Sequence, residues 1–146
     1  MSALNKIAYF QNRRDEVPNQ ALARELAETK NKKGIQEIAE NLEHKNPSVQ
    51  SDCLKVLYEI GYLDPGLIAD YVDEFLKLLK SKNNRMVWGS MIALATIAEL
   101  KPGEIWKHVD GCHKDEFLSI LEARRSEMTP SQLARLRKIT RQLEAP

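Results

Sequence analysis

Three side chains in the last third of the chain are of types that bind zinc. His108, Cys112 and His113 form an H-x3-C-H pattern, and His108 and Cys112 would share one face of a helix. Structural zinc takes four ligands, typically as two close pairs. The remaining candidates, His44 and Cys53, lie far earlier in the chain. The sequence therefore predicts no metal site.

Motifs for catalysis are missing from the sequence. It contains no glycine-rich phosphate loop, no G-x-S-x-G and no H-E-x-x-H. Acidic pairs recur at corresponding places, as Asp73-Glu74 and Asp115-Glu116. Such repetition is typical of carboxylates that meet the dipole of a helix rather than of one active site. We expect a protein that is not an enzyme and needs no cofactor.

The two cysteines, Cys53 and Cys112, are too few for a disulfide framework. Both fall on the inward side of predicted helices, where cysteine acts as a small apolar residue. This usage predicts a reducing compartment, the cytoplasm.

An internal repeat indicates which elements position these residues. The segment 35–68 aligns without a gap on the segment 72–105, and ten of the 34 aligned pairs are identical at a spacing of 37 residues. A period of this length is typical of stacked supersecondary units, because one unit cannot bury its apolar face alone.

Each unit has the pattern of two antiparallel helices. Apolar residues at helical spacing predict a first helix from Ile35 to Leu42. Asn46 is expected to cap a second helix with Pro47 at its first position, and this helix should stop near Gly61. In the next unit, Asp64-Pro65 repeats the cap and proline, and Asn83 or Asn84 caps a helix that runs to Leu100.

The same reasoning extends to both ends of the chain. Leu4, Ile7, Ala8 and Phe10 suggest one helix, and the residues 18–30 suggest another. Beyond 105 the spacing slips by five residues near Gly111, and a capping box at 129–132 begins a final helix. We predict a single all-α domain over 1–146 with eight or nine helices and no strand. Its helix pairs would cover about 1–31, 34–62, 65–100 and 102–146.

The turn at 43–57, EHKNPSVQSDCLKVL, resembles the turn and second helix of a HEAT repeat. Asn46, Pro47 and Val49 match that pattern, whereas Gln50 stands where arginine is usual. In the second unit Asn84 replaces the proline and Val87 the arginine. The resemblance covers roughly 35–143 and does not separate HEAT from armadillo repeats. It implies a right-handed α-solenoid of about four helix pairs that serves as a protein-binding scaffold.

The two aligned units differ most on their second helix. Trp88, Ile92 and Ala95 form one apolar stripe where the first unit keeps polar residues. The ordinary interpretation is that a third unit covers this stripe. The functional interpretation is a docking groove for a partner helix or peptide anchored on Trp88, because tryptophan is the usual hot-spot residue. The residues that would form this surface are Trp88, Ile92, Val87, Tyr58 and Tyr62.

Charge supports a second hypothesis, nucleic-acid binding. The net charge is only +1, but basic residues gather in clusters that include Lys80, Lys82, Arg85, Arg135, Lys138 and Arg141. Phosphate contacts need several such cations on one face. Nine acidic side chains in 35–76 interrupt a continuous track, so solvated helix faces are the ordinary alternative.

The remaining patterns bear on membranes and self-association. No apolar run approaches the roughly 18 residues of a membrane-spanning helix, and the N-terminal residues lack the layout of an export signal. A protein or peptide partner is thus the leading expectation, with no membrane. Self-association through an uncapped end of the stack is a third alternative.

Overall fold

A computed structural model describes residues 2–98, 100, 101, 105, 130, 134 and 137, and the elements in this part of the chain are all helical. The α-helices are α1 (Val17–Thr29), α2 (Lys32–Glu40), α3 (Pro47–Leu63), α4 (Val72–Leu78) and α5 (Asn84–Ile97). Short 3-10 helices are η1 (Ala3–Lys6), η2 (Tyr9–Gln11), η3 (Asn41–Glu43), η4 (Pro65–Leu67) and η5 (Ala69–Tyr71). The slip at Gly111 lies outside the described residues, as do the final helix and the unit at 102–146 apart from residues 105, 130, 134 and 137.

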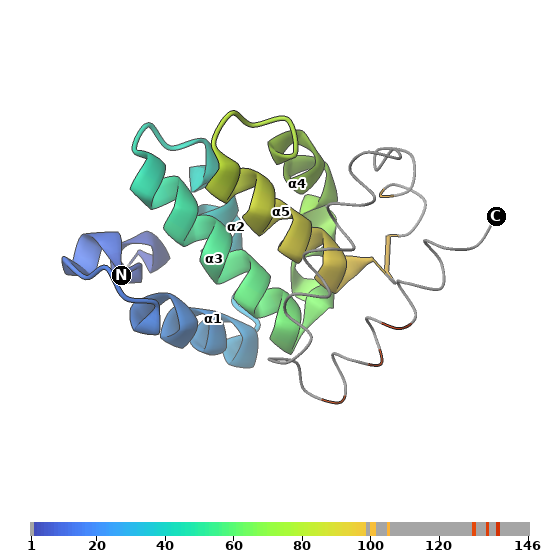
Figure 1. Ribbon diagram of the computed structural model, residues 1–146. Helices are drawn as coiled ribbons and strands as arrows, with labels where there is room; N and C mark the ends of the chain where they lie inside the picture. Colours follow the sequence, from blue (N-terminus) through green and yellow to red (C-terminus); the bar gives the residue numbers. More distant parts are fainter. Residues whose placement is uncertain are drawn as a thin grey trace.

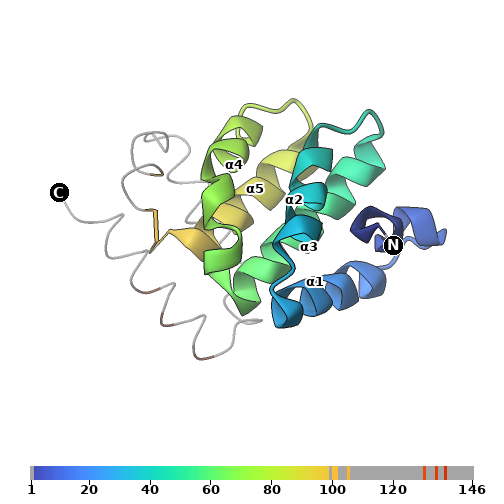
Figure 2. The same ribbon diagram turned by 180° about the vertical axis from the view of Figure 1, so that it is seen from behind.

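Helix α3 is the centre of the arrangement. It packs between α1 and α5, while α2 packs on α3 and α4 packs on α5 (Figure 1). Two helix pairs, α2 with α3 and α4 with α5, therefore stand next to each other. Their second helices, α3 and α5, form one face of the molecule, and α2 and α4 form the opposite face (Figure 2).

The two helix pairs begin their second helices with the same device. The Asn46 side-chain oxygen accepts a hydrogen bond from Ser48 N at 2.8 Å, and that of Asn83 accepts one from Arg85 N at 3.0 Å. Both asparagines are N-caps, with extended backbone angles. Because they stand 37 residues apart, the predicted repeat of the second helix and its cap is confirmed.

Glycines bring α3 and α5 close together. A Cβ added at Gly61 would collide with the side chain of Thr96, and one added at Gly89 would lie 2.5 Å from Leu54 Cδ2. Helix α3 ends at Leu63, two residues beyond Gly61, where the sequence predicted its end, and Gly61 is buried inside the last turn. The hydrophobic core extends from the N-terminal segment to α5, and its fully buried residues along this contact include Leu54, Leu57, Ile60, Phe75, Leu94 and Ile97.

The link from α3 to α4 also differs from the prediction. Asp64 forms no side-chain cap, and two 3-10 helices, η4 and η5, fill the stretch where a helix was expected to begin at Pro65. Ile68 is fully buried, and its Cδ1 atom would lie 2.9 Å from a Cβ at Gly61. This stretch, with η4, packs on α3, and α4 begins only at Val72.

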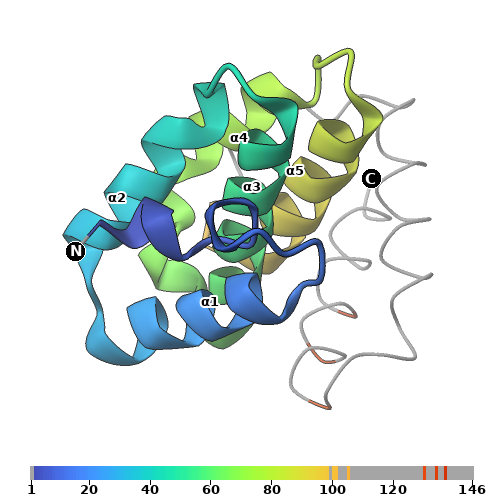
Figure 3. The same cartoon turned by 90° about the vertical axis from the view of Figure 1, so that its left-hand side faces the viewer.

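The N-terminal segment (residues 2–12) forms the 3-10 helices η1 and η2 instead of one α-helix. It lies across α1, α2 and α3 (Figure 3). Glu37 accepts hydrogen bonds from Ser2 Oγ at 2.6 Å and Leu4 N at 3.0 Å, and Asp52 accepts one from Tyr9 N at 2.8 Å. Ile7 and Ala8 are buried, whereas Phe10 is exposed.

Candidate functional site

Trp88 is the most prominent exposed apolar side chain on α5. It is 52% exposed, although most residues of this helix are buried. The next residue, Gly89, is buried against Leu54 of α3. The close approach of α5 to α3 at Gly89 leaves Trp88 at the border between the two helices, facing water. An exposed indole of this kind is a candidate binding residue.

A hollow of about 340 Å³ lies beside Trp88. Three parts of the chain form it: the loop before α1 together with Asn19 in the first turn of that helix, the middle of α3, and the first half of α5. We call it the Trp88 hollow. Its lining residues are Arg14, Asp15, Glu16, Asn19, Ser51, Asp52, Leu54, Lys55, Tyr58, Arg85, Trp88, Gly89 and Ile92.

The structure brings three of the five predicted partner-binding residues to this hollow. Trp88 is exposed, whereas Tyr58 and Ile92 are 9% and 8% exposed and form buried parts of its wall. Tyr62 stands edge-on to Tyr58, with ring centroids 6.0 Å apart, but neither it nor Val87 lines the hollow. Val87 is partly buried against the core. Trp88 is thus the one residue of the five that offers a large exposed apolar surface.

Lys55 connects the apolar wall to the charged rim. Its Nζ lies 3.1 Å from Glu16 Oε1, 3.3 Å from Glu59 Oε1 and 4.8 Å from the ring centroid of Tyr58. Burial would lower the pKa of Lys55, but the Tyr58 side chain and the two carboxylates outweigh it and raise the pKa. The ammonium group stays charged at neutral pH, so Lys55 is suited to hold the rim together and not to act as an amine nucleophile.

The charged rim was missed by the sequence reasoning. Arg14, Asp15 and Glu16 come from the loop before α1 and meet Arg85 and Trp88 of α5. Within this loop, Arg13 pairs with Asp15, with Nε 2.8 Å from Oδ2. No local pattern signals such a meeting, because the loop and α5 are about 70 residues apart in the chain.

The described residues offer little for reactive chemistry. Burial raises the pKa of the Cys53 thiol to about 12, with Asp52 and Glu37 adding to the effect. This thiol is therefore protonated and sealed in the core. Among the described residues, no three histidine, cysteine or acidic side chains are placed to hold a metal ion. His108, Cys112 and His113 lie outside them.

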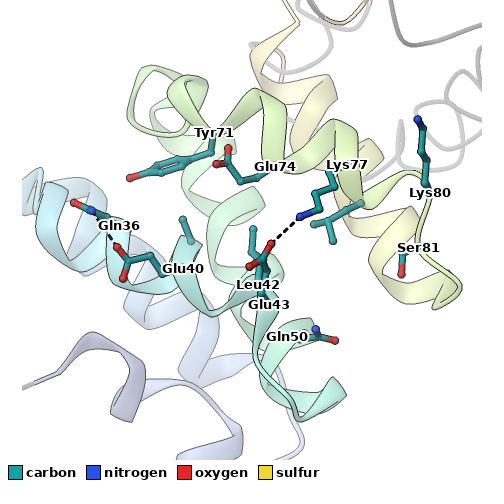
Figure 4. A pocket seen from close by; sticks show the side chains of 12 residues that line it. Gln36, Glu40, Leu42, Glu43, Gln50, Tyr71, Glu74, Lys77, Lys80 and Ser81 are labelled. Atoms are coloured by element: carbon teal, nitrogen blue, oxygen red, sulfur yellow. Dashed lines mark hydrogen bonds and ion pairs between the residues drawn. The ribbon is translucent and has the colours of Figure 1, made fainter.

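A second, larger hollow opens on the opposite face. It has a volume of about 990 Å³ and runs between α2 with η3 on one side and α4 on the other (Figure 4). We call it the α2–α4 groove. Its lining residues are Gln36, Ala39, Glu40, Leu42, Glu43, Gln50, Tyr71, Glu74, Lys77, Leu78, Lys80 and Ser81. The sequence reasoning missed it, since helical spacing shows which residues are apolar but not how far apart two helices stand.

The basic residues of the nucleic-acid hypothesis do not gather in one of these hollows. Lys80 lines the α2–α4 groove, Arg85 lines the Trp88 hollow, and Lys82 is exposed and lines neither. Arg135, Lys138 and Arg141 lie outside the described residues. Within the described part of the chain, Lys80 and Arg85 therefore belong to different surfaces.

Among the described helices, none combines the length and the apolar character that crossing a membrane requires. The sequence matches no model of a protein family, and no curated protein or solved structure is similar to it.

Proposed function

We propose that this chain is a non-catalytic, cytoplasmic protein-binding scaffold of the HEAT-like α-solenoid type, and that it binds its partner through the Trp88 hollow. The observation that carries the proposal is the 52% exposure of Trp88 beside a hollow that Tyr58 and Ile92 also line. A tryptophan that stands over an apolar wall inside a charged rim has the layout of an interface hot spot.

The energetics favour an apolar anchor from the partner. Removing roughly 100 Å² of an indole from water contributes about 2.5 kcal/mol. The rim carries both signs of charge, with Arg14 and Arg85 beside Asp15, Glu16 and Asp52. A partner segment with one apolar residue between polar ones would fill the hollow and meet this rim, and a short amphipathic helix has that pattern.

The solenoid part of the proposal is supported by the paired helices. The caps at Asn46 and Asn83 stand one period apart, and α3 lies against α5 as successive second helices do in a stack. Nucleic-acid binding has less support, because Lys80 and Arg85 line different hollows and so do not form one basic face there.

The test places a photo-crosslinking amino acid at position 88 in the full chain, and a matched one at Leu63. Leu63 is the right control because it is 53% exposed and lies outside the Trp88 hollow. In extract of the native host, a partner should crosslink from position 88 and not from position 63.

Affinity for the captured partner then decides the proposal. Trp88→Ala should weaken binding by about 30-fold or more, the effect of losing a hot-spot residue, while Leu63→Ala changes it little. Circular dichroism checks that both variants keep their helices. Equal affinity of the two variants, with both folded, would refute the proposal. Crosslinks between two copies of the chain would instead identify self-association as the function of this surface.

A further inference from the structure

The α2–α4 groove has an apolar floor and a wide opening. Ala39, Leu42 and Leu78 contribute apolar side chains, and Leu42 is almost fully buried. The groove lies on the face opposite to the Trp88 hollow, and the two share no lining residue. Whatever binds here would leave the Trp88 hollow accessible.

Charge divides the groove along its length. Glu40, Tyr71 and Glu74 line one end, and Lys80 lies at the other end (Figure 4). Between them, Lys77 Nζ donates a hydrogen bond to Glu43 Oε1 at 2.9 Å, and this ion pair links α4 to η3. The pair neutralises the middle of the groove. We call the part lined by Glu40, Tyr71 and Glu74 the acidic end.

The acidic end is only partly neutralised by the described residues: besides its pair with Glu43, Lys77 feels the charge of Glu74, which helps to raise the pKa of Lys77. Glu40 accepts one hydrogen bond, from Gln36 Nε2 at 3.1 Å, and neither Glu40 nor Glu74 forms an ion pair with another described residue. The pKa of the Tyr71 hydroxyl is raised by burial and then by the charges of Asp70, Glu74 and Glu40. Three carboxylates thus act on one partly buried aromatic ring.

This combination selects the chemistry of a ligand. An aromatic ring with nearby carboxylates attracts a cationic head group by cation–π contact and charge-assisted hydrogen bonds. The same charges repel phosphate groups and anionic lipids. The carboxylates are not grouped to hold a metal ion, since the described residues contain no such cluster. The adjoining apolar floor suits an aliphatic side chain next to the cation.

We propose that the α2–α4 groove binds a protein segment in which an arginine or lysine stands next to a leucine-like residue. The cationic head lies against Tyr71 between Glu40 and Glu74, and the aliphatic neighbour packs on the partly exposed Leu78. The planar guanidinium of arginine fits better than an ammonium, because it stacks on a ring while it donates to carboxylates. This surface is separate from the Trp88 hollow, so the chain would have two binding faces.

The test compares two peptides that differ only in charge. Acetyl-Leu-Arg-Leu-amide and acetyl-Leu-citrulline-Leu-amide have nearly the same shape, but citrulline is neutral. Each is titrated into the full isotope-labelled chain and followed by amide chemical shifts. The arginine peptide should bind about tenfold more tightly than the citrulline peptide, as expected for charge-assisted hydrogen bonds. Its largest shifts should fall on residues 36–43 and 71–78.

Variants locate the effect. Glu40→Gln with Glu74→Gln should abolish most of the preference for arginine over citrulline. Asp73→Asn is the matched control. Asp73 is an exposed carboxylate of α4, next to Glu74 in the chain, but it does not line the groove. This variant should leave the preference nearly unchanged. Tyr71→Leu should weaken the binding of the arginine peptide more than that of the citrulline peptide, because the aromatic ring acts on the cation.

Several outcomes would overturn the proposal. These are equal binding of the two peptides, shifts concentrated around Trp88, or an equal loss in Asp73→Asn and the double variant. Trp88→Ala tests whether the Trp88 hollow and the α2–α4 groove are independent, and it should leave the binding of the arginine peptide unchanged. The two proposals therefore succeed or fail separately.

Discussion

Glu37 and Asp52 cap helices that are far from them in the chain. Glu37 accepts from Leu4 N near the start of η1, 33 residues away, and Asp52 accepts from Tyr9 N at the start of η2, 43 residues away. Carboxylates are favourable at these positions because the first N–H groups of a helix lack partners within it. Asp52 also accepts from Asn19 Nδ2 at 3.0 Å, and Asn19 Oδ1 accepts from Ala8 N at 2.9 Å. These side chains hold the N-terminal segment on the helix pairs.

The Glu37 cap predicts a pH dependence of stability. Burial alone would raise the pKa of Glu37, but hydrogen bonds from Ser2 Oγ and the backbone at Leu4 outweigh it, and the pKa lies below its ordinary value of 4.5. A lowered folded-state pKa means stability that is present above the unfolded value and is lost as the pH falls through the folded value. Glu37→Gln should therefore lower the free energy of unfolding by about 1 kcal/mol at pH 7 and by less at an acidic pH below the folded-state pKa of Glu37.

Urea unfolding of the wild type and the variant at the two pH values measures this difference. Glu28→Gln is the control, because Glu28 is exposed and its side chain accepts no hydrogen bond from another described residue. It should change the stability little at pH 7. A Glu37→Gln effect of the same size at both pH values would contradict the linkage.

At the scale of elements, the contact between α3 and α5 depends on the absence of side chains at Gly61 and Gly89. Alanine usually stabilises a helix relative to glycine by up to about 1 kcal/mol. At Gly61, however, the added methyl would collide with Thr96 and come within 2.9 Å of Ile68 Cδ1. Both neighbours are buried, so the steric cost dominates. We expect Gly61→Ala to lower the free energy of unfolding by about 1–3 kcal/mol.

Gly66→Ala is the matched control for Gly61→Ala. Its added methyl would meet only Asp64 Oδ1, at 3.5 Å, which is ordinary contact, and Gly66 has no positive φ angle. It should be neutral or stabilise slightly through the unfolded state. Thermal unfolding measures the melting temperatures of both variants. An unchanged melting temperature for Gly61→Ala would mean that α3 and α5 can move apart without a loss of stability.

The elements also show what the sequence can predict. The caps at Asn46 and Asn83 were predictable, because capping joins residues only two positions apart. The 3-10 helices η4 and η5 were not, since they depend on the packing of η4 against α3 and on the burial of Ile68, which local spacing does not show. The same reason explains η1 and η2, whose caps come from Glu37 and Asp52. Tertiary contacts overrode local propensity in each case.

At the scale of the whole molecule, the candidate site was predictable only in part. Comparing the aligned units identified Trp88 as the departure from the repeat, and it is exposed beside a hollow. The same comparison could not show that Ile92 and Tyr58 are buried, nor that Arg14 and Glu16 complete the rim. Those features depend on how the N-terminal loop crosses α3, and the α2–α4 groove depends on the spacing of helices. The spacing of apolar residues along a helix indicates neither the path of a distant loop nor the distance between two helices.

The N-terminal segment gives the last prediction. Its Ile7 and Ala8 are buried, and it satisfies the side chain of Asn19, which is only 2% exposed. A chain without residues 1–12 would uncover apolar surface on α1, α2 and α3 and leave Asn19 without its Ala8 partner. Burying one isoleucine contributes about 1.5–3 kcal/mol, and a stack with an open apolar end tends to associate. We expect the shortened chain to lose at least about 3 kcal/mol of stability and to form dimers.

Calorimetry and light scattering over a range of concentrations measure both effects. Phe10→Ala in the full-length chain is the control, because Phe10 belongs to the same segment but is exposed. It should stay monomeric if the wild type does, with little change in stability. A shortened chain that unfolds at the wild-type temperature and stays monomeric would show that α1 alone closes this end of the helix stack. The hydrogen bonds to Glu37 and Asp52 would then hold the segment without supporting the fold.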